Sequence, residues 1–446
     1  MRRWLWGAVL GLLGCEINPA FDPDSTVEEH ADSDGTVGPG DPEGPVGEPG
    51  VPLPDPCPPL PDPTGSIITV GPERAGELPE IVGQAPADST VVLTPGTYRV
   101  DRSLYFNAPG ITLRSSTGRP EDVIIDGQRQ ATVVVFIQQP RITLAELTLR
   151  RPVEHLVHIS GSDEGPAGGV VGYRLRLVDP GAAAFKVNPS YEEQPADDGV
   201  LACSSVMLTD AGRQELGDAC EQISGVAGFG SFGWTIRDNH VEGLWCETGF
   251  AGSAIRFLET SADTTVLRNT IRDCTSGIML GLWEEQEPRR VYDSVPCGPG
   301  YFDHVGGVVS NNTVVATGTG IAASGVGFDT GIGLWNVCGA TVVHNTVVSA
   351  IETYNSIEYR FTRTQARVVN NLVTNEILDR DDAGVPVAGN AIVDLGEFVD
   401  PLGGDVHLVD GASAIDAGVQ LGEDSVLHDI DGEPRDEWPD VGADEH

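Results

Sequence analysis

Between Trp234 and Glu376, apolar positions alternate with polar ones around an asparagine that returns five times. Each copy has an aliphatic residue three before the Asn and another two after it, as in Val266-Leu-Arg-Asn269-Thr-Ile271. A helix would place its apolar residues at i, i+3, i+4 and i+7, so this spacing predicts a short strand, a turn and a second strand. Because Asn tolerates a positive φ, we expect it to turn the chain. The five are Asn239, Asn269, Asn312, Asn345 and Asn371.

The spacing of the copies predicts a solenoid. Successive asparagines are 30, 43, 33 and 26 residues apart, which is typical of stacked coils with loops of variable length. One copy cannot bury its own inward side chains, so the copies must stack in parallel sheets. Upstream, Ile142-Thr-Leu-Ala145-Glu-Leu147 fits the same template with Ala145 in the Asn position. We therefore predict a continuous solenoid from about Val91 to about Val373.

These repeats resemble the right-handed parallel β-helix superfamily, which includes pectate lyases and chondroitinase-type lyases. The resemblance implies an all-β, single-stranded right-handed parallel β-helix with an N-terminal cap. Ser413-Ala-Ile-Asp-Ala-Gly418 and the segment from Asp429 to Glu445 are similar to a tail found on many secreted bacterial β-helix proteins. In physical terms this C-terminal tail would cap the open last coil, which would otherwise expose strand edges. The superfamily contains lyases, hydrolases, epimerases and non-enzymes, so the fold alone does not define an activity.

The start of the chain has the features of an export signal. Two arginines and a short apolar run, residues 1–14, predict a signal peptide too brief to span a bilayer. Leu12-Leu13-Gly14-Cys15 resembles the bacterial lipobox, which implies cleavage before Cys15 and lipid attachment to its thiol; an ordinary signal peptide is the alternative. Glu16 after the cysteine implies the outer membrane. We expect an exported protein, lipid-anchored in the cell envelope and facing the exterior or the periplasm.

Composition divides the remaining chain. Residues 15–64 are acidic, rich in Pro and Gly, and contain no Lys or Arg, so they predict a disordered tether. The β-helix is expected over residues 65–376 and an acidic capping extension over residues 377–446. With 26 basic against 67 acidic residues, the net charge of −41 excludes nucleic acid as a partner and suits divalent cations or neutral partners, although it can serve solubility alone. We expect a monomer that binds a polysaccharide or an envelope component.

Export permits disulfides among the eight cysteines. With Cys15 lipidated and Cys57 in the tether, six cysteines remain, and their connectivity stays open. Cys203 and Cys220 bracket one loop, Cys246 and Cys274 lie about one coil apart, and Cys297 could reach Cys338. No closely spaced Cys/His set predicts zinc.

The resemblance also implies a chemistry. Lyases on this fold remove a proton beside a uronate carboxylate with Lys or Arg as the base, and Ca²⁺ or Arg neutralises that carboxylate. Lys186, the only lysine, lies in the first of two insertions that break the repeat, Ala182–Gly217 and Trp283–Phe302. The predicted catalytic residues are Lys186, Arg213, Arg256 and Glu259, and the predicted substrate-binding residues are Asn188, Asp210, Trp245 and Trp283. The alternative is that these charges form surface pairs and that the tryptophans serve packing.

Carboxylates in the tail could bind Ca²⁺ through oxygen ligands, with Asp429, Asp431 and Asp440 as the candidates. Motifs of polygalacturonase-type hydrolases, such as Gly-His-Gly, and of pectate lyases, such as Trp-Ile-Asp-His, are missing from the sequence. Two hypotheses result. The first is an envelope-anchored β-helix that binds or cleaves extracellular polysaccharide, as a lyase or a glycoside hydrolase if it is an enzyme. The second is a non-catalytic envelope or adhesion protein that uses the solenoid as a rigid display scaffold.

Overall fold

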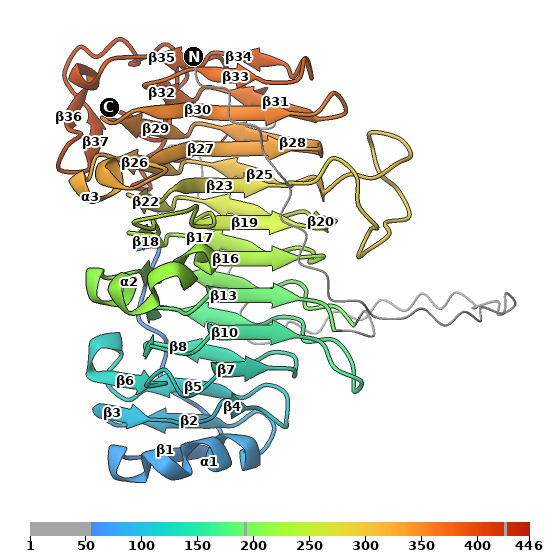
Figure 1. Cartoon of the computed structure of the whole chain (residues 1–446), viewed down its shortest axis with the longest axis vertical. Helices are drawn as coiled ribbons and strands as arrows, with labels where there is room; N and C mark the ends of the chain where they lie inside the picture. The colour runs from blue at the N-terminus through green and yellow to red at the C-terminus, as the bar shows by residue number, and fades with distance from the viewer. Residues whose placement is uncertain (1–54, 191–193, 423–425) are drawn as a thin grey trace, which may run out of the picture. The chain divides into compact units, whose positions relative to one another are not determined.

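The computed structural model describes residues 55–190, 194–422 and 426–446 (Figure 1). The predicted signal peptide, Cys15 and the tether up to residue 54 lie outside the described residues. Nearly all regular structure in the described part is β, in three sheets of parallel strands. Successive strands join the three sheets in turn, so each circuit of the chain is one coil of a right-handed parallel β-helix. The predicted fold class is confirmed.

We call the sheets A, B and C. Sheet A contains β1 (Ile67–Val70), β2 (Thr90–Leu93), β5 (Thr112–Ser115), β8 (Thr143–Ala145), β11 (Val171–Tyr173), β14 (Val200–Ala202), β17 (Thr235–Arg237), β20 (Ser261–Ala262), β21 (Thr265–Leu267), β24 (His304–Val305), β25 (Val308–Ser310), β28 (Val337–Val343), β31 (Gln365–Val369) and β34 (Val387–Ala388). Sheet B contains β3 (Gly96–Arg99), β6 (Val123–Asp126), β9 (Thr148–Arg150), β12 (Arg176–Val178), β15 (Ser205–Met207), β18 (His240–Glu242), β22 (Thr270–Arg272), β26 (Thr313–Ala316), β29 (Thr346–Ser349), β32 (Leu372–Val373) and β35 (Ala391–Ile392). Sheet C contains β4 (Leu104–Tyr105), β7 (Val133–Ile137), β10 (His155–Ser160), β13 (Ala183–Asn188), β16 (Ser224–Phe229), β19 (Ile255–Leu258), β23 (Ser276–Leu280), β27 (Phe328–Trp335), β30 (Thr353–Arg360) and β33 (Ile377–Asp379).

Short helices lie at the first coil and between strands. The 3₁₀ helix η1 (Pro72–Glu77) leads into α1 (Leu78–Gln84), which lies across the first coil and buries Leu78 and Val82 completely (Figure 1). This is the expected N-terminal cap, and it covers the core at that end. No helix in the described ranges has both the length and the apolar character needed to cross a membrane. The other helices are η2 (Pro120–Asp122), α2 (Asp210–Leu216), η3 (Gly217–Gln222), α3 (Thr319–Ala323) and η4 (Leu395–Glu397).

A column of asparagine side chains runs inside the turn between sheets A and B. From Asn269 onward, the Oδ1 of each accepts hydrogen bonds from the backbone N–H and the Nδ2 of the asparagine one coil earlier, at 2.8 to 3.1 Å. Asn312 Nδ2 also donates to the carbonyls of Val266 and Ser310. The column therefore satisfies backbone groups that the turn buries. Its members are Asn239, Asn269, Asn312, Asn345, Asn371 and Asn390.

The turn itself is made by the residue before each asparagine, which corrects the sequence prediction. Arg268, Asn311 and His344 have φ values of 50°, 52° and 53°, whereas their asparagine neighbours are not in the left-handed region. The asparagines are instead required as hydrogen-bonding groups. The predicted alignment of the early coil is also wrong by two residues. The register of sheet A aligns Ala145 with Arg237, so Leu147, and not Ala145, takes the position of Asn239.

Three disulfides join Cys57 to Cys203, Cys220 to Cys246 and Cys297 to Cys338, and Cys274 is free and buried. The third bridge is one that the spacing in the sequence allowed, whereas Cys203 pairs with Cys57 of the predicted tether and not with Cys220. The reason is that the end of the predicted tether packs on sheet A, where Tyr173 donates to the carbonyl of Pro58 at 2.7 Å. Residues 55–64 therefore belong to the folded unit.

The C-terminal segment lies along the side of the last coils rather than across the end. Strands β33 to β35 continue the coils beyond residue 376, and β36 (Phe398–Asp400) then pairs antiparallel with β37 (Asp405–Leu408). The backbone N–H of Ala443 donates to Thr346 Oγ1 at 2.8 Å, and the amide of Asn311 donates to the carbonyl of His428. This placement corrects the expected end cap. It is explained by outward apolar residues of sheet B, which pack with the tail in a second core of Val315, Val348, Leu372, Phe398, Val406, Leu408, Ala412, Ala414 and Val441.

The asparagine column predicts a large local cost for Asn312→Ala. The substitution removes the partners of buried amide and carbonyl groups, so we expect the free energy of unfolding to fall by about 3 kcal/mol. Denaturant unfolding followed by circular dichroism measures this loss. The control is Asn107→Ala, since Asn107 is exposed and donates one hydrogen bond to Gly83. Equal losses for the two variants would contradict a special role of the column.

Candidate functional site

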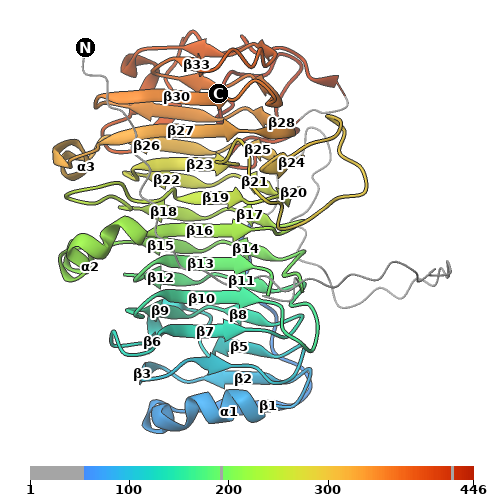
Figure 2. The ribbon, with the colours of Figure 1, turned by 45° about the vertical axis from the view of Figure 1, so that its right-hand side comes forward.

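The outer face of sheet C lies between α2 at one edge and the loop after β23 at the other (Figure 2). Inward positions of this sheet are apolar and fully buried, as at Val157, Phe185 and Ile255. The outward positions form one ladder in register along the coils. Its members are Tyr105, Phe136, His158, Lys186, Ala227, Arg256, Met279, Gly333, Glu358 and Leu378.

Lys186 and Arg256 lie two coils apart in this ladder and both approach the ring of Phe229. The Lys186 Nζ is 6.0 Å and the Arg256 Cζ 5.6 Å from the ring centroid. Neither side chain makes a hydrogen bond or an ion pair with another described residue, and Arg256 Nε is buried without a partner. Two half-buried cations with no direct hydrogen-bonded or ion-pair partner at one place are a costly arrangement for structure alone. They therefore mark a candidate site for an anionic ligand.

The surroundings of Lys186 favour its neutral amine. Burial is the largest effect and lowers the pKa of Lys186, and the cations Arg289 and Arg256 lower it further. The carboxylates of Glu154 and Glu259 act in the opposite direction but do not reverse the shift. Burial also lowers the pKa of Arg256. An amine with a lowered pKa can act as a base closer to neutral pH than an ordinary lysine.

Two histidines that sequence reasoning missed lie beside Lys186. His158 is paired with Lys186 in the ladder, and the rings of His155 and His158 are 5.3 Å apart. Burial lowers the pKa of His155 to about 3 and that of His158 to about 4, so both imidazoles are neutral at pH 7. His158 Nε2 donates to Asn188 Oδ1 at 2.7 Å, because the Asn188 amide nitrogen is used by the carbonyl of Pro189. The predicted binding residue Asn188 thus orients a ring next to Lys186.

Glu259 and the second insertion border the same place. Glu259 follows β19 and forms an ion pair with Arg289 of the insertion. The buried Asp303 accepts hydrogen bonds from the backbone N–H groups of Glu259, Leu282 and Trp283 at 2.9, 2.6 and 3.2 Å. Asp303 therefore fixes both the start of the insertion and the turn that carries Glu259. The structure brings Lys186, Arg256 and Glu259 together, with Arg289 as an addition.

Buried polar atoms without partners gather on this face. In the described part of the chain, eleven buried side-chain nitrogen or oxygen atoms have no hydrogen-bond partner. Such atoms are rare in folded proteins and each calls for a partner. Four of the eleven belong to strands of sheet C, namely atoms of Ser224, Arg256, Trp335 and Asn355.

Farther along the ladder the face becomes acidic. Glu358 is buried and accepts hydrogen bonds from Arg380 Nη1 at 3.1 Å and Asn355 Nδ2 at 3.0 Å. Nearby Asp329 is half-buried, and burial together with the Glu358 charge raises the pKa of Asp329 to about 6. The face thus has a cationic end around Lys186 and an acidic end around Glu358.

Three predicted residues lie elsewhere and have structural partners. Arg213 is buried on α2, where it donates to the carbonyls of Trp245 and Gly243, both at 2.9 Å, and to Asp210 at 2.6 Å. Its guanidinium lies 3.6 Å from the Trp245 ring centroid. Arg213, Asp210 and Trp245 therefore hold α2 against the coil and do not join Lys186. Trp283 is 48% exposed at the start of the second insertion.

The three predicted metal ligands do not converge as one set. Asp429 is buried and accepts from the backbone N–H groups of Asp431 and Glu433, while Asp440 accepts from those of Asp416 and His446. Their oxygens are therefore used for the fold of the tail. Asp431 instead lies with His407 and Asp444, and His407 Nε2 is 2.8 Å from Asp431 Oδ2. Hydrogen bonds to Asp405 and Asp431 outweigh burial and raise the pKa of His407 to about 9, so this group already holds its own cation at pH 7.

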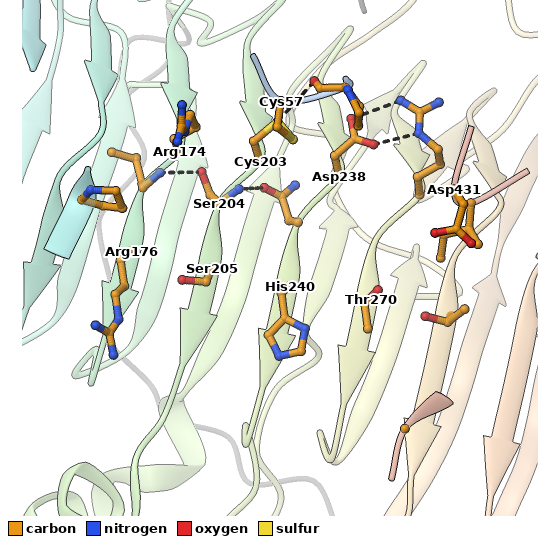
Figure 3. Close-up of a pocket in the computed structure, with 18 of the residues that line it drawn as sticks. Cys57, Arg174, Arg176, Cys203, Ser204, Ser205, Asp238, His240, Thr270 and Asp431 are labelled. Carbon is orange, nitrogen blue, oxygen red and sulfur yellow. Dashed lines mark hydrogen bonds and ion pairs between the residues drawn. A yellow bond between two sulfur atoms is a disulfide. The ribbon is translucent and has the colours of Figure 1, made fainter. Parts of the chain in front are cut away.

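A cavity of about 700 Å³ lies away from sheet C, between the Cys57–Cys203 bridge, sheet B and the tail (Figure 3). Ser205, His240 and Thr270 line it in a row (Figure 3). Its buried charge is compensated, because Asp238 pairs with Arg268 at 2.7 Å and with Arg237 at 2.6 Å. The unpaired cations and the lowered lysine pKa therefore favour the open face of sheet C as the functional site.

The lowered pKa of Lys186 can be measured directly, since ¹³C reductive methylation labels a single lysine side chain in this protein. We expect its NMR titration to give a pKa below the ordinary value of 10.5. Arg256→Gln should raise that pKa because it removes a neighbouring positive charge. Arg176→Gln, at an exposed position of sheet B, should leave it unchanged. An ordinary pKa in the unsubstituted protein would show that Lys186 is solvated.

Solved structures with a similar fold include pectate lyase Pel9A, at a TM-score of 0.51 and 12% identity over 86% of this chain and 97% of that one. The PL6-family alginate lyase AlyGC gives a TM-score of 0.45 and 13% identity over 74% of this chain and 48% of that one. A rhamnogalacturonan lyase gives 0.42 and 13% over 70% and 83%. No family model and no curated protein matches the sequence. The likeness to Pel9A shows that the chain has the right-handed parallel β-helix fold.

Proposed function

We propose that the outer face of sheet C binds a uronate-containing polysaccharide and cleaves it by a lyase-like β-elimination. The observation that carries this proposal is the pair of unpartnered cations, Lys186 and Arg256, over Phe229. A fork of guanidinium N–H groups suits a carboxylate, and an aromatic ring suits the apolar face of a sugar. The pectate lyase Pel9A, which shares the fold, is consistent with this class of reaction.

In this mechanism Arg256 pairs with the uronate carboxylate and stabilises the negative charge that develops when the neighbouring carbon loses its proton. The neutral amine of Lys186 takes that proton. The released electron pair forms the C4–C5 double bond, and the bond from C4 to the glycosidic oxygen breaks. Lys186 then returns its proton to the leaving oxygen, so the products are one shortened chain and one chain with an unsaturated end.

The neutral histidines suit the same reaction. His155 and His158 add no positive charge at pH 7, so they do not compete with Arg256 for the carboxylate. His155 donates through Nδ1 to the carbonyl of Ala183 at 3.2 Å, which leaves its Nε2 as an acceptor for a sugar hydroxyl. Their role here is to position the sugar.

We further propose that the chain is exported and anchored through Cys15 in the bacterial cell envelope. The signal sequence with its lipobox-like end supports this location. Three disulfides also support it, since such bridges persist in oxidising compartments outside the cytoplasm.

Turnover on a panel of polygalacturonate, alginate, hyaluronan and unsulfated chondroitin tests the reaction, with the ultraviolet absorbance of unsaturated products as readout. Lys186→Met should lower kcat/KM by about 10²–10⁴-fold, because it removes the base. Arg256→Gln should lower it as well, whereas Arg176→Gln on sheet B should not. Binding with no turnover of any glycan would favour the display-scaffold alternative, and full activity of Lys186→Met would refute the mechanism.

The proposed mechanism also predicts how kcat/KM depends on pH in the same assay. Because Lys186 must be neutral to accept the proton, kcat/KM should rise with pH through the lowered pKa of Lys186 and then level off. The pKa from the rate profile should agree with that from NMR. A profile that falls over this range would assign the base to another group.

A further inference from the structure

The acidic end of the sheet C face has its own binding chemistry. Glu358 stands three coils from Arg256 in the outward ladder, separated from it by Met279 and Gly333. Strand spacing makes this about 14 Å along the stack. A polysaccharide that lies along the ladder with one residue at Arg256 would therefore place another residue at Glu358. This inference rests on the proposed function.

The polar atoms there are mainly hydrogen-bond acceptors. Asn355 is fully buried and its Nδ2 donates to Glu358 Oε2, but its Oδ1 has no partner. Among the described residues, Asp329, one coil earlier in β27, receives a side-chain hydrogen bond only from Thr330, at 3.2 Å. Arg380 occupies the other oxygen of Glu358. The Asn355 Oδ1 therefore lacks a hydrogen-bond donor, although a buried carbonyl oxygen requires one. The two carboxyl groups beside it are acceptors and cannot supply it when ionised.

The charge of the cluster decides what kind of sugar could supply that donor. Arg380 compensates one of the two carboxylates, so the remaining charge is negative whenever Asp329 is ionised. A uronate would bring further acceptors and a like charge, and like charges at close range cost several kcal/mol. A sugar hydroxyl or amine brings donors without that repulsion. The exposed ring of Tyr354, over which Arg380 lies at 5.3 Å, borders the same place.

We propose that Asp329, Asn355 and Glu358 form a second subsite, which takes a neutral or amino sugar through its hydroxyl or amine donors and rejects a uronate. The substrate is then a heteropolysaccharide in which uronates are separated by such sugars. Polymers with a carboxylate on every residue are poor substrates. The long-range repulsion from a chain of net charge −41 acts in the same direction.

The test compares kcat/KM for alternating polymers, hyaluronan and unsulfated chondroitin, with that for polygalacturonate and polymannuronate. The wild-type protein should prefer the alternating polymers by about tenfold or more. Asp329→Asn with Glu358→Gln should bring the ratio close to one by improving the homopolymers. A control with the same change in charge, Asp163→Asn with Glu285→Gln at exposed positions, should keep the wild-type ratio. Asp329→Asn alone covers the case in which loss of the Glu358–Arg380 pair prevents folding, and should lower the ratio in the same direction.

Equal or better use of the homopolymers by the wild type would overturn the subsite, as would equal ratios for the two double variants. Calorimetric binding of Ca²⁺ alone, lost in Asp329→Asn with Glu358→Gln, would also overturn it, because the cluster would then be a cation site. The proposed function fails in a different way. If the mechanism is wrong, Lys186→Met leaves the turnover of every polymer unchanged. If no polymer binds at all, both proposals are refuted.

Discussion

Backbone groups that the turn between sheets A and B buries need partners, and in the coils from Asn239 to Asn390 one asparagine per coil supplies them. The Asn312 side chain links three coils, because it accepts from Asn269 and donates to both Asn345 and Val266. This requirement fixes one position per coil but not the length of the coil. The interval of 43 residues between Asn269 and Asn312 therefore accommodates the second insertion without breaking the column. The fold keeps its ladders in register while its loops vary.

The register places the candidate site. Strand alternation sends Phe185 and Ile255 into the core and leaves Lys186 and Arg256 on the outer face of sheet C. The insertion then adds Arg289, which Asp303 helps to position through the backbone of Leu282 and Trp283. A rigid ladder thus supplies the reacting groups, and a variable loop supplies the border. This division is common in folds where loops on a rigid scaffold carry function.

The sequence predicted the fold well because the Asn-centred repeat reports directly on coil stacking. Strand alternation within Ile255-Arg256-Phe257 is also enough to place Arg256 opposite its apolar neighbours. The environment of Arg213 could not be predicted from the repeat, because Arg213 lies on a helix inside an insertion, where no repeat indicates its partners. The acidic composition before residue 65 hid the packing of Cys57, as one disulfide and a few hydrogen bonds hold that segment. His155 and His158 became visible only through the register of sheet C, since the sequence does not show which coil lies beside Lys186.

The face of sheet C has a cationic end although the net charge of the chain is −41. The distance between Lys186 and most of the acidic residues explains this. At 0.1 M salt, charges beyond about 10 Å are largely screened, so most surface carboxylates have little effect on Lys186. Burial and the two nearby arginines act at short range, where screening is weak. Local geometry therefore determines the protonation of Lys186, while the overall charge acts on a long polymer as it approaches. The two effects select at different stages, since one governs the reaction at a single residue and the other governs which polymers reach it.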